Sequence, residues 1–148
     1  MFHMIWKEPL QLDALNSMPP NMATHIGIEF TAWDESSLSA RMPVDARTHQ
    51  PMGILHGGAS VVLAESLGSI ASNLIIDTSK YMGVGLEINA NHLRPVSGGF
   101  VTGTCTPIHL GGKTHVWDIR ILNDRGKLVC ISRLTVAIVG TRLEARSQ

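Results

Sequence analysis

The sequence of 148 residues is poor in several features that identify common protein classes. It has two cysteines, Cys105 and Cys130, and both fall in strand-like segments. They predict buried free thiols, because two are too few for a disulfide framework and no CxxC pair is present to bind zinc. The formal net charge is zero, since Lys plus Arg and Asp plus Glu each number 12. Without a basic excess, we expect no surface for nucleic acid and none for an anionic membrane.

Long hydrophobic runs are also absent. No stretch approaches the roughly 18–20 consecutive apolar residues of a membrane-spanning helix. The opening residues, MFHMIWKEPLQLDALN, contain no basic segment followed by an apolar run, so we expect no signal peptide and a cytoplasmic protein. The hydrophobic fraction of 44% indicates one globular domain, expected over residues 1–140 and followed by a polar tail at 141–148.

The sequence does contain one long helical segment among many strand-like segments. Residues 57–76 lack proline and are too long for one strand, so we expect a helix of about four to five turns. Consecutive strands with short turns form antiparallel sheets, so we predict an α+β fold with this helix on the concave face of one sheet. The other expected elements are a short helix at 10–18, strands near 26–34, 37–44, 81–94, 99–109, 114–122 and 127–139, and a hairpin turn at 123–126.

Two of the expected strands alternate clearly between apolar and polar residues. In the segment 37–44, the alternation predicts one shared face for Leu38, Ala40, Met42 and Val44. In the segment 81–94, it predicts one shared face for Met82, Val84, Leu86, Ile88 and Ala90. Such alternation is typical of strands in a sheet.

Glu65 is the only charged residue between Gly57 and Ile76. The rest of this segment is small or apolar, a pattern that is typical of a buried helix. An isolated buried carboxylate costs several kcal/mol, so its presence indicates an acid tuned for chemistry. The structural alternatives are an ion pair with Arg94 or Arg133, or a partly solvated helix end.

The start of the same helix supports a chemical role. Residues 52–58, MGILHGG, contain no Ser, Thr, Asp or Asn to cap the first turn, which leaves its first N–H groups free for another acceptor. Such groups polarise a carbonyl oxygen and stabilise the oxyanion that forms from it. The alternative is that Ser60 caps a later helix start.

The spacing of these two features predicts a dimer. Gly57 and Glu65 are eight helical residues apart, which is roughly 12 Å, so both can hardly reach one carbonyl carbon. Two such helices that run antiparallel across a twofold axis solve this problem. Each site then takes Glu65 from one chain and the Gly57 N–H from the other, and we expect an obligate homodimer with shared sites.

Three stretches identify a family resemblance: QPMGILHGGASVVLAES, GLEINANHLRP and HLGGKTHVW. They resemble the hotdog-fold acyl-CoA thioesterases, over nearly the whole chain from Met4 to Ile138. Within that family, the similarity is greatest to the 1,4-dihydroxy-2-naphthoyl-CoA thioesterases of menaquinone biosynthesis and to the proofreading thioesterases of enterobactin synthesis. The resemblance implies a curved antiparallel sheet around one long helix, and dimers that pair into tetramers.

The resemblance also implies roles for individual residues. The catalytic carboxylate falls on Glu65, the backbone oxyanion donor on Gly57, and a supporting polar pair on Gln50 and His56. No cofactor is implied, since coenzyme A is part of the substrate. The positions implied to hold the coenzyme A arm and acyl group are Gly85, His92, Leu93, Arg94, Pro95, His109, Leu110, Gly111, Gly112, Lys113 and Thr114. Gly112 departs from the family, which often has a basic or polar residue there.

Competing motifs are weaker. GGKT at 111–114 resembles the end of a phosphate-binding loop, but Pro107 stands where that loop needs glycine, and strand residues follow. A role for Lys113, Arg94 and His92 in binding the coenzyme A phosphates fits better, with a plain hairpin turn as the alternative.

The histidines and serines offer no competing catalytic motif. The seven histidines lack metal-ligand spacing, and we expect no metal site. HGG at 56–58 resembles the oxyanion loop of α/β-hydrolases, but the sequence has no GxSxG motif to carry the nucleophile of that fold. Ser66 and Ser69 are therefore not expected to act as nucleophiles. For Ser69, the alternatives are a hydrogen bond to Glu65, a hydrogen bond to a substrate hydroxyl, and a simple packing role.

Together these features predict the hydrolysis of an aromatic acyl-CoA thioester. Glu65 then acts as nucleophile or as general base. The alternatives are proofreading of a misloaded aryl carrier protein, a broad-specificity acyl-CoA thioesterase, a hotdog dehydratase and a non-catalytic acyl-CoA binding module.

Overall fold

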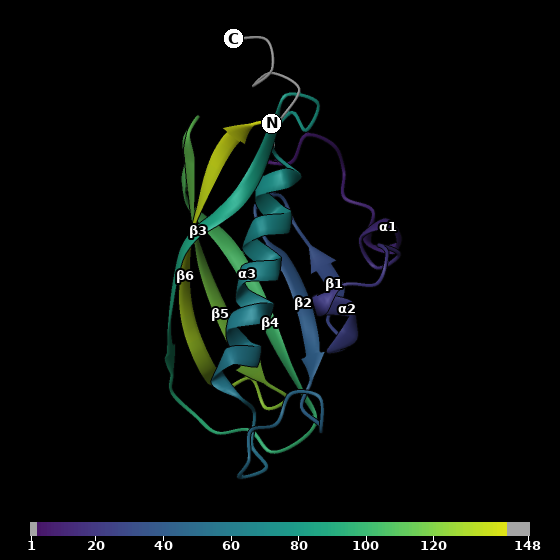
Figure 1. Ribbon diagram of the computed structural model, residues 1–148, viewed down its shortest axis with the longest axis vertical. Helices are drawn as coiled ribbons and strands as arrows, with labels where there is room; N and C mark the ends of the chain where they lie inside the picture. Colours follow the sequence, from purple (N-terminus) through teal and green to yellow (C-terminus); the bar gives the residue numbers. More distant parts are fainter. Residues whose placement is uncertain (1–2, 142–148) are drawn as a thin grey trace.

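The computed structural model describes residues 3–141 and shows one curved sheet wrapped around one long helix (Figure 1). The six strands are antiparallel, in the order β1-β2-β4-β5-β6-β3. This is the α+β architecture that the sequence predicts. The elements are α1 (Leu12–Leu15), α2 (Met22–His25), β1 (Glu29–Trp33), β2 (Leu38–Pro43), α3 (Gly57–Asn73), β3 (Tyr81–His92), β4 (Phe100–Leu110), β5 (Thr114–Asn123) and β6 (Leu128–Gly140).

The predicted short helix is represented by α1, while α2 was not predicted. Asn21 caps α2, because its side chain accepts the backbone N–H groups of Ala23 and Thr24 while the Thr24 hydroxyl accepts the N–H of Asn21. The predicted tail at 141–148 lies outside the described residues except for Thr141. No helix within residues 3–141 is long and apolar enough to cross a membrane.

The helix α3 packs one face on the sheet. Leu63, Ala64, Leu67 and Ala71 on this face are fully buried. Gly68 lies so close to the sheet that a Cβ there would collide with the Leu134 side chain. Small residues therefore let the helix approach the strands closely, as its composition suggested.

Next to the end of α3, a buried polar cluster replaces apolar packing. The Ser72 hydroxyl accepts the indole N–H of Trp117 at 2.8 Å and contacts His115 Nδ1 at 2.9 Å. Burial lowers the pKa of His115, which favours its neutral form. The Trp117 ring also stacks on Trp6. His115, Trp6 and Trp117 thus belong to the buried core.

The two cysteines are buried and unbonded, in agreement with the sequence prediction. Burial raises the pKa of the Cys105 thiol to about 12 and raises that of Cys130 as well. Both thiols are therefore inert parts of the core.

The alternation in β2 is confirmed, since Leu38, Ala40, Met42 and Val44 are all buried. The prediction of one shared face is wrong for β3. A bulge between Gly85 and Glu87 reverses the sides, so Met82, Val84 and Leu86 are exposed, whereas Ile88 and Ala90 pack against the core. β3 is also an edge strand with exposed apolar side chains.

Candidate active site

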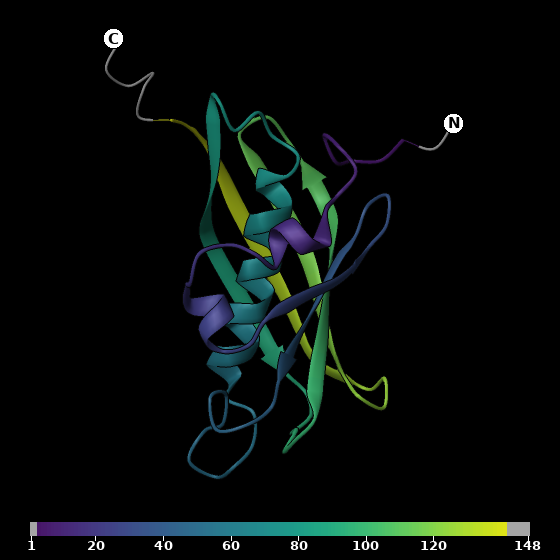
Figure 2. The same cartoon turned by 90° about the vertical axis from the view of Figure 1, so that its right-hand side faces the viewer.

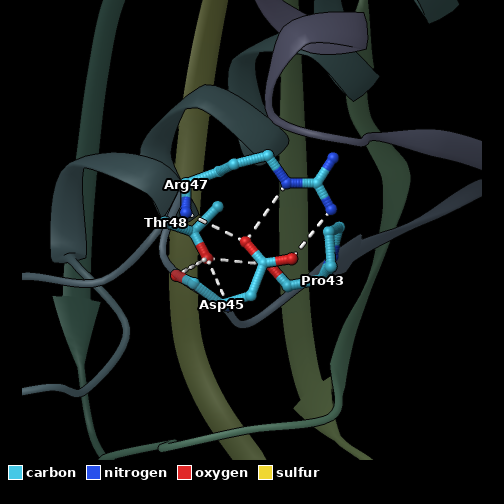
Figure 3. Close-up of polar contacts among 4 residues, drawn as sticks. All are labelled: Pro43, Asp45, Arg47 and Thr48. Atoms are coloured by element: carbon cyan, nitrogen blue, oxygen red, sulfur yellow. Dashed lines mark hydrogen bonds and ion pairs between the residues drawn. The ribbon is translucent and has the colours of Figure 1, made fainter.

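A tightly bonded loop leads into the start of α3 (Figure 3). The Asp45 carboxylate accepts the backbone N–H of Arg47 and its guanidinium, at 2.8 Å from Nη2, and this pairing lowers the pKa of Asp45. The buried Thr48 hydroxyl donates to the carbonyl of Pro43 at 2.8 Å. Thr48 also accepts the His56 N–H on its backbone carbonyl at 2.8 Å. These bonds fix the point where the helix begins.

The first turn of α3 is capped, contrary to the sequence prediction. His56 Nδ1 accepts the backbone N–H of Gly58 at 2.8 Å. The sequence does not predict this cap, because Ser, Thr, Asp and Asn are the residues that usually occupy the N-cap position. The N–H of Gly57 has no acceptor among the described residues, so the predicted donor is the one left free.

Gly57 borders a pocket of about 330 Å³ together with Gln50, His92, Leu93, Arg94 and Pro95. The His92 ring lies against Gly57, where an added Cβ would be 2.7 Å from Nε2. Gln50 accepts the Met52 N–H on its side-chain oxygen, which leaves its amide NH₂ group available as a donor. The structure therefore groups these predicted residues around one free backbone donor.

His56 faces a different pocket from the one that Gly57 borders. Its side chain lines a cavity of about 330 Å³ together with Arg47 and His49. Its structural contribution is the helix cap, which orients the first N–H groups of α3.

Glu65 lies at the middle of α3 and is half-buried. Its carboxylate rests on Gly85 of β3, where any added Cβ would overlap Oε1. Within residues 3–141 the carboxylate has no ion pair, and Arg94 instead donates to the carbonyl of Leu128 at 2.9 Å. The alternative of an ion pair with Arg94 or Arg133 is therefore wrong, and so is full burial within one chain.

One chain does not bring Glu65 and Gly57 together. Glu65, Ser66 and Ser69 line a groove of about 500 Å³ between α3 and the N-terminal segment. This groove shares no lining residue with the pocket of Gln50 and Gly57. Glu65 and Gly57 therefore border two separate cavities of one chain.

The β4–β5 hairpin, which carries the predicted positions His109 to Thr114, lies far from His92 and Arg94. Thr114 pairs with Ala137, whereas His92 pairs with Cys130, seven residues away on β6. Seven strand residues span roughly 23 Å. Grouping of Lys113 with Arg94 and His92 within one chain is therefore wrong.

The hairpin itself closes in the ordinary way. The Gly111 N–H donates to the Thr114 carbonyl at 2.9 Å, and the His109 ring lies against Gly111. Gly112, Lys113, His109 and Leu110 are exposed. These side chains are therefore accessible at the end of the sheet that lies away from His92.

Comparisons with known proteins show the family and the fold of the chain. The model of the Thioesterase superfamily matches residues 52–130. The chain is similar to the 1,4-dihydroxy-2-naphthoyl-CoA hydrolase of Escherichia coli, with 52% identity over 92% of this chain and 100% of that protein. It is also similar to the proofreading thioesterase EntH of Klebsiella pneumoniae, with 49% identity over 93% of this chain and 100% of that protein.

Solved structures share the fold. A mutant thioesterase of Pseudomonas aeruginosa matches with 56% identity and a TM-score of 0.91, covering 93% of this chain and 99% of that one. A thioesterase of Staphylococcus aureus is 40% identical, with a TM-score of 0.79, and the match covers 82% of this chain and 100% of that one. Its structure was solved with a glutamate replaced by alanine and, separately, with a glutamine replaced by alanine. Those two positions lie fifteen residues apart, as Gln50 and Glu65 do here. The chain therefore belongs to the Thioesterase superfamily and is a hotdog-fold acyl-CoA thioester hydrolase.

Proposed function

We propose that the protein hydrolyses an aromatic acyl-CoA thioester at a site shared by two chains of a homodimer. The observation that carries this proposal is the separation of the site into halves. Among the described residues, the Gly57 N–H has no acceptor and the Glu65 carboxylate has no ion pair, and the two belong to different pockets of one chain. A second chain supplies the missing half of each site.

The edge strand β3 offers the surface for this dimer. The Asn73 side chain accepts the Gly83 N–H at 2.9 Å and donates to the Gly83 carbonyl at 3.3 Å, so this part of the edge is already covered. The remaining edge, residues 85–92, is free to pair with a second copy. Exposed edge strands are ready templates for such pairing.

Antiparallel pairing of this edge would assemble the site. Glu65 rests on Gly85, and Gly57 lies against His92, at the two ends of the free edge. With a twofold axis near the middle of that edge, Gly85 of one chain lies beside the partner's His92, about 4.8 Å away in the pairing direction. Glu65 then approaches the partner's Gly57. We propose that such dimers pair further into tetramers.

The same pairing also bears on coenzyme A. It brings the partner's Lys113 to the end of the sheet that carries His92 and Arg94. Positive charge from both chains then faces the phosphates of the nucleotide.

In the proposed reaction, the Gly57 N–H and the Gln50 amide hold the thioester oxygen and stabilise the oxyanion. Glu65 of the partner takes a proton from water, and the hydroxide attacks the carbonyl carbon. The C–S bond breaks, and the coenzyme A thiolate receives the proton. In the alternative route, the Glu65 oxygen attacks the carbonyl carbon, the C–S bond breaks and the coenzyme A thiolate leaves; water then hydrolyses the anhydride, and its proton goes to the thiolate. Either route yields a free acid and coenzyme A.

For the acyl group, we propose 1,4-dihydroxy-2-naphthoyl-CoA, which would place the enzyme in cytoplasmic menaquinone biosynthesis. The E. coli relative that carries this name supports the choice. Proofreading of a misloaded aryl carrier protein is the second candidate, because the K. pneumoniae relative is named for proofreading.

Thiol release from a panel of substrates tests the proposal. The panel contains 1,4-dihydroxy-2-naphthoyl-CoA, benzoyl-CoA, butanoyl-CoA and an aryl-loaded carrier protein. We expect the highest kcat/KM for the naphthoyl thioester. A higher value for the loaded carrier protein would favour proofreading, and equal values for all acyl groups would contradict an aromatic preference.

Replacing Gly85 by alanine should displace the catalytic carboxylate. An added Cβ overlaps the Glu65 carboxylate, and a misplacement of about 1 Å can cost roughly 100-fold in rate. We expect kcat to fall by about 10- to 100-fold, measured by thiol release.

The matched control is Gly83→Ala on the same strand. Its Cβ would meet Val136, Asn73 and Ser72 at 3.1–3.3 Å but not Glu65. Equal losses of kcat in both variants would show that β3 is merely sensitive to added bulk.

A further inference from the structure

The loop between β2 and α3 carries Gln50, whose side chain is proposed to donate to the thioester oxygen. Figure 2 shows this loop projecting beyond the first turn of α3. Its base is held on both sides, since His49 pairs with Leu55 in an isolated β-bridge and the Leu55 N–H donates to the Val96 carbonyl at 2.7 Å. Its tip has little packing, because Met52 is 81% exposed. The conformation of the tip therefore depends on hydrogen bonds within the loop.

The tip is a tight turn that its own backbone closes. The Gly53 N–H donates to the Gln50 carbonyl at 2.9 Å, and the Gln50 N–H donates to the Ile54 carbonyl at 2.8 Å. Pro51 and Gly53 occupy the second and fourth positions of this turn, where type I turns favour proline and glycine. The φ of Gly53 is 76°, a left-handed conformation that closes a three-residue hairpin loop and that glycine adopts without strain.

The turn also fixes the side chain of Gln50. The Gln50 side-chain oxygen accepts the Met52 N–H. Because a backbone N–H can only donate, the atom that faces it must be the amide oxygen, and the amide cannot turn over without losing this bond. Gln50 lines the pocket of about 330 Å³ that Gly57 borders. The NH₂ group is therefore held as the free end of a side chain in the same pocket as the free backbone donor.

The orientation of this amide determines whether it assists the reaction. A donor that is already oriented toward the developing oxyanion costs no reorganisation when the charge forms. The opposite orientation of the Gln50 amide would present an oxygen to the oxyanion, and two acceptors repel each other. A glutamine without the Met52 bond would also lose rotamer freedom on binding the substrate.

We propose that the turn at Gln50–Ile54 positions the Gln50 amide for hydrolysis, with the Met52 N–H as the group that orients it and Gly53 as the residue that keeps the turn closed. The inference rests on the proposed function, because it takes Gln50 as a donor to the thioester oxygen. Met52 and Gly53 do not line the pocket that contains Gln50, so they are positioning residues that act through it.

Gly53→Val tests this inference by straining the turn. Within residues 3–141 an added Cβ at Gly53 would meet nothing within 4 Å, whereas a β-branched residue strongly disfavours a positive φ. The matched control is Gly126→Val in the turn between β5 and β6, where φ is 72° and the space around an added Cβ is equally open. Gly53→Val is also combined with Gln50→Ala, and each protein is assayed with the thioester of the panel that the wild type hydrolyses best.

We expect Gly53→Val to lower kcat by about tenfold and to leave KM within about twofold, the pattern of an interaction made only in the transition state. Gln50→Ala should lower kcat by about 100-fold. In that background Gly53→Val should cost less than about twofold more, because the side chain that the turn positions is already gone. Gly126→Val should leave kcat unchanged, although both glycine variants should lower the Tm by similar amounts, since they carry the same kind of backbone strain.

Three kinetic results would overturn the inference. They are an unchanged kcat in Gly53→Val, an equal loss of kcat in Gly126→Val, and the full tenfold loss in the Gln50→Ala background. The last result would mean that the turn acts on the site by a route that does not involve Gln50.

Hydrogen exchange of the Met52 backbone amide, measured by NMR, gives a readout that needs no catalysis. We expect Gln50→Ala to accelerate this exchange by about tenfold or more, because the acceptor of the N–H is removed. An exchange rate equal to that of the wild type would overturn the inference. If the wild type hydrolyses no thioester of the panel while the exchange rates differ as expected, the proposed function fails and the orientation of Gln50 by the turn survives.

Discussion

Replacing Glu65 by glutamine is expected to lower kcat by about a thousandfold. The amide keeps the size of the side chain and its place against Gly85, but it can neither accept a proton from water nor attack a carbonyl carbon. A thousandfold loss corresponds to about 4 kcal/mol of transition-state stabilisation. Thiol release under saturating substrate measures the effect.

The fold should survive this change, because the carboxylate makes no ion pair within residues 3–141. We expect the Tm to stay within a few degrees of wild type. KM should also change little, since the amide still fills the space beside the thioester. A variant that retains near-wild-type kcat would remove Glu65 from the mechanism. Glu65→Asp separates charge from reach, and we expect it to be impaired because its shorter arm misplaces the carboxylate.

The architecture was predictable because hydrophobic periodicity reflects the sheet and the helix directly. Leu38, Ala40 and Met42 alternate in the sequence and are buried in β2. In β3 the apolar alternation continues across the bulge at Gly85, so the sequence contains no sign that the sides reverse. Met82 and Leu86 therefore lie on the exposed side of this edge strand, although the sequence groups them with Ile88 and Ala90.

Individual residues of the candidate site could be predicted from the sequence, but most of the contacts between them could not. The lone charge of Glu65 in an apolar helix marked it in the sequence, and the spacing to Gly57 indicated two chains. No sequence signal showed that Gly85 makes room for the carboxylate, because that contact joins a helix to a distant strand. The cap at His56 and the position of the Lys113 hairpin likewise depend on tertiary structure.

Replacing Gly57 by proline should lower kcat by about 100- to 1,000-fold. Proline removes the backbone N–H that is proposed to hold the oxyanion, and loss of one such donor typically costs this much. The first position of a helix accepts proline well, and the extended backbone of His56, with ψ 129°, suits a residue before proline. The variant should therefore fold, and circular dichroism and Tm check this.

Gly57→Ala is the matched control for the proline variant. It adds the same Cβ, which the exposed His92 ring must move to admit, but it keeps the N–H. We expect alanine to be at least tenfold more active than proline. Similar losses in both variants would assign the effect to the displaced His92 ring and not to the missing donor.

Mixing the two inactive variants tests the shared site directly. In a dimer of one Glu65→Gln chain and one Gly57→Pro chain, one site combines both defects, while the other has an intact carboxylate and an intact donor. Random assortment makes half of the dimers mixed, so denaturing and refolding the variants together should restore about one quarter of wild-type activity. A site contained within a single chain predicts no recovery, because every chain then carries one defect. The recovered activity therefore measures whether Glu65 acts across the subunit boundary.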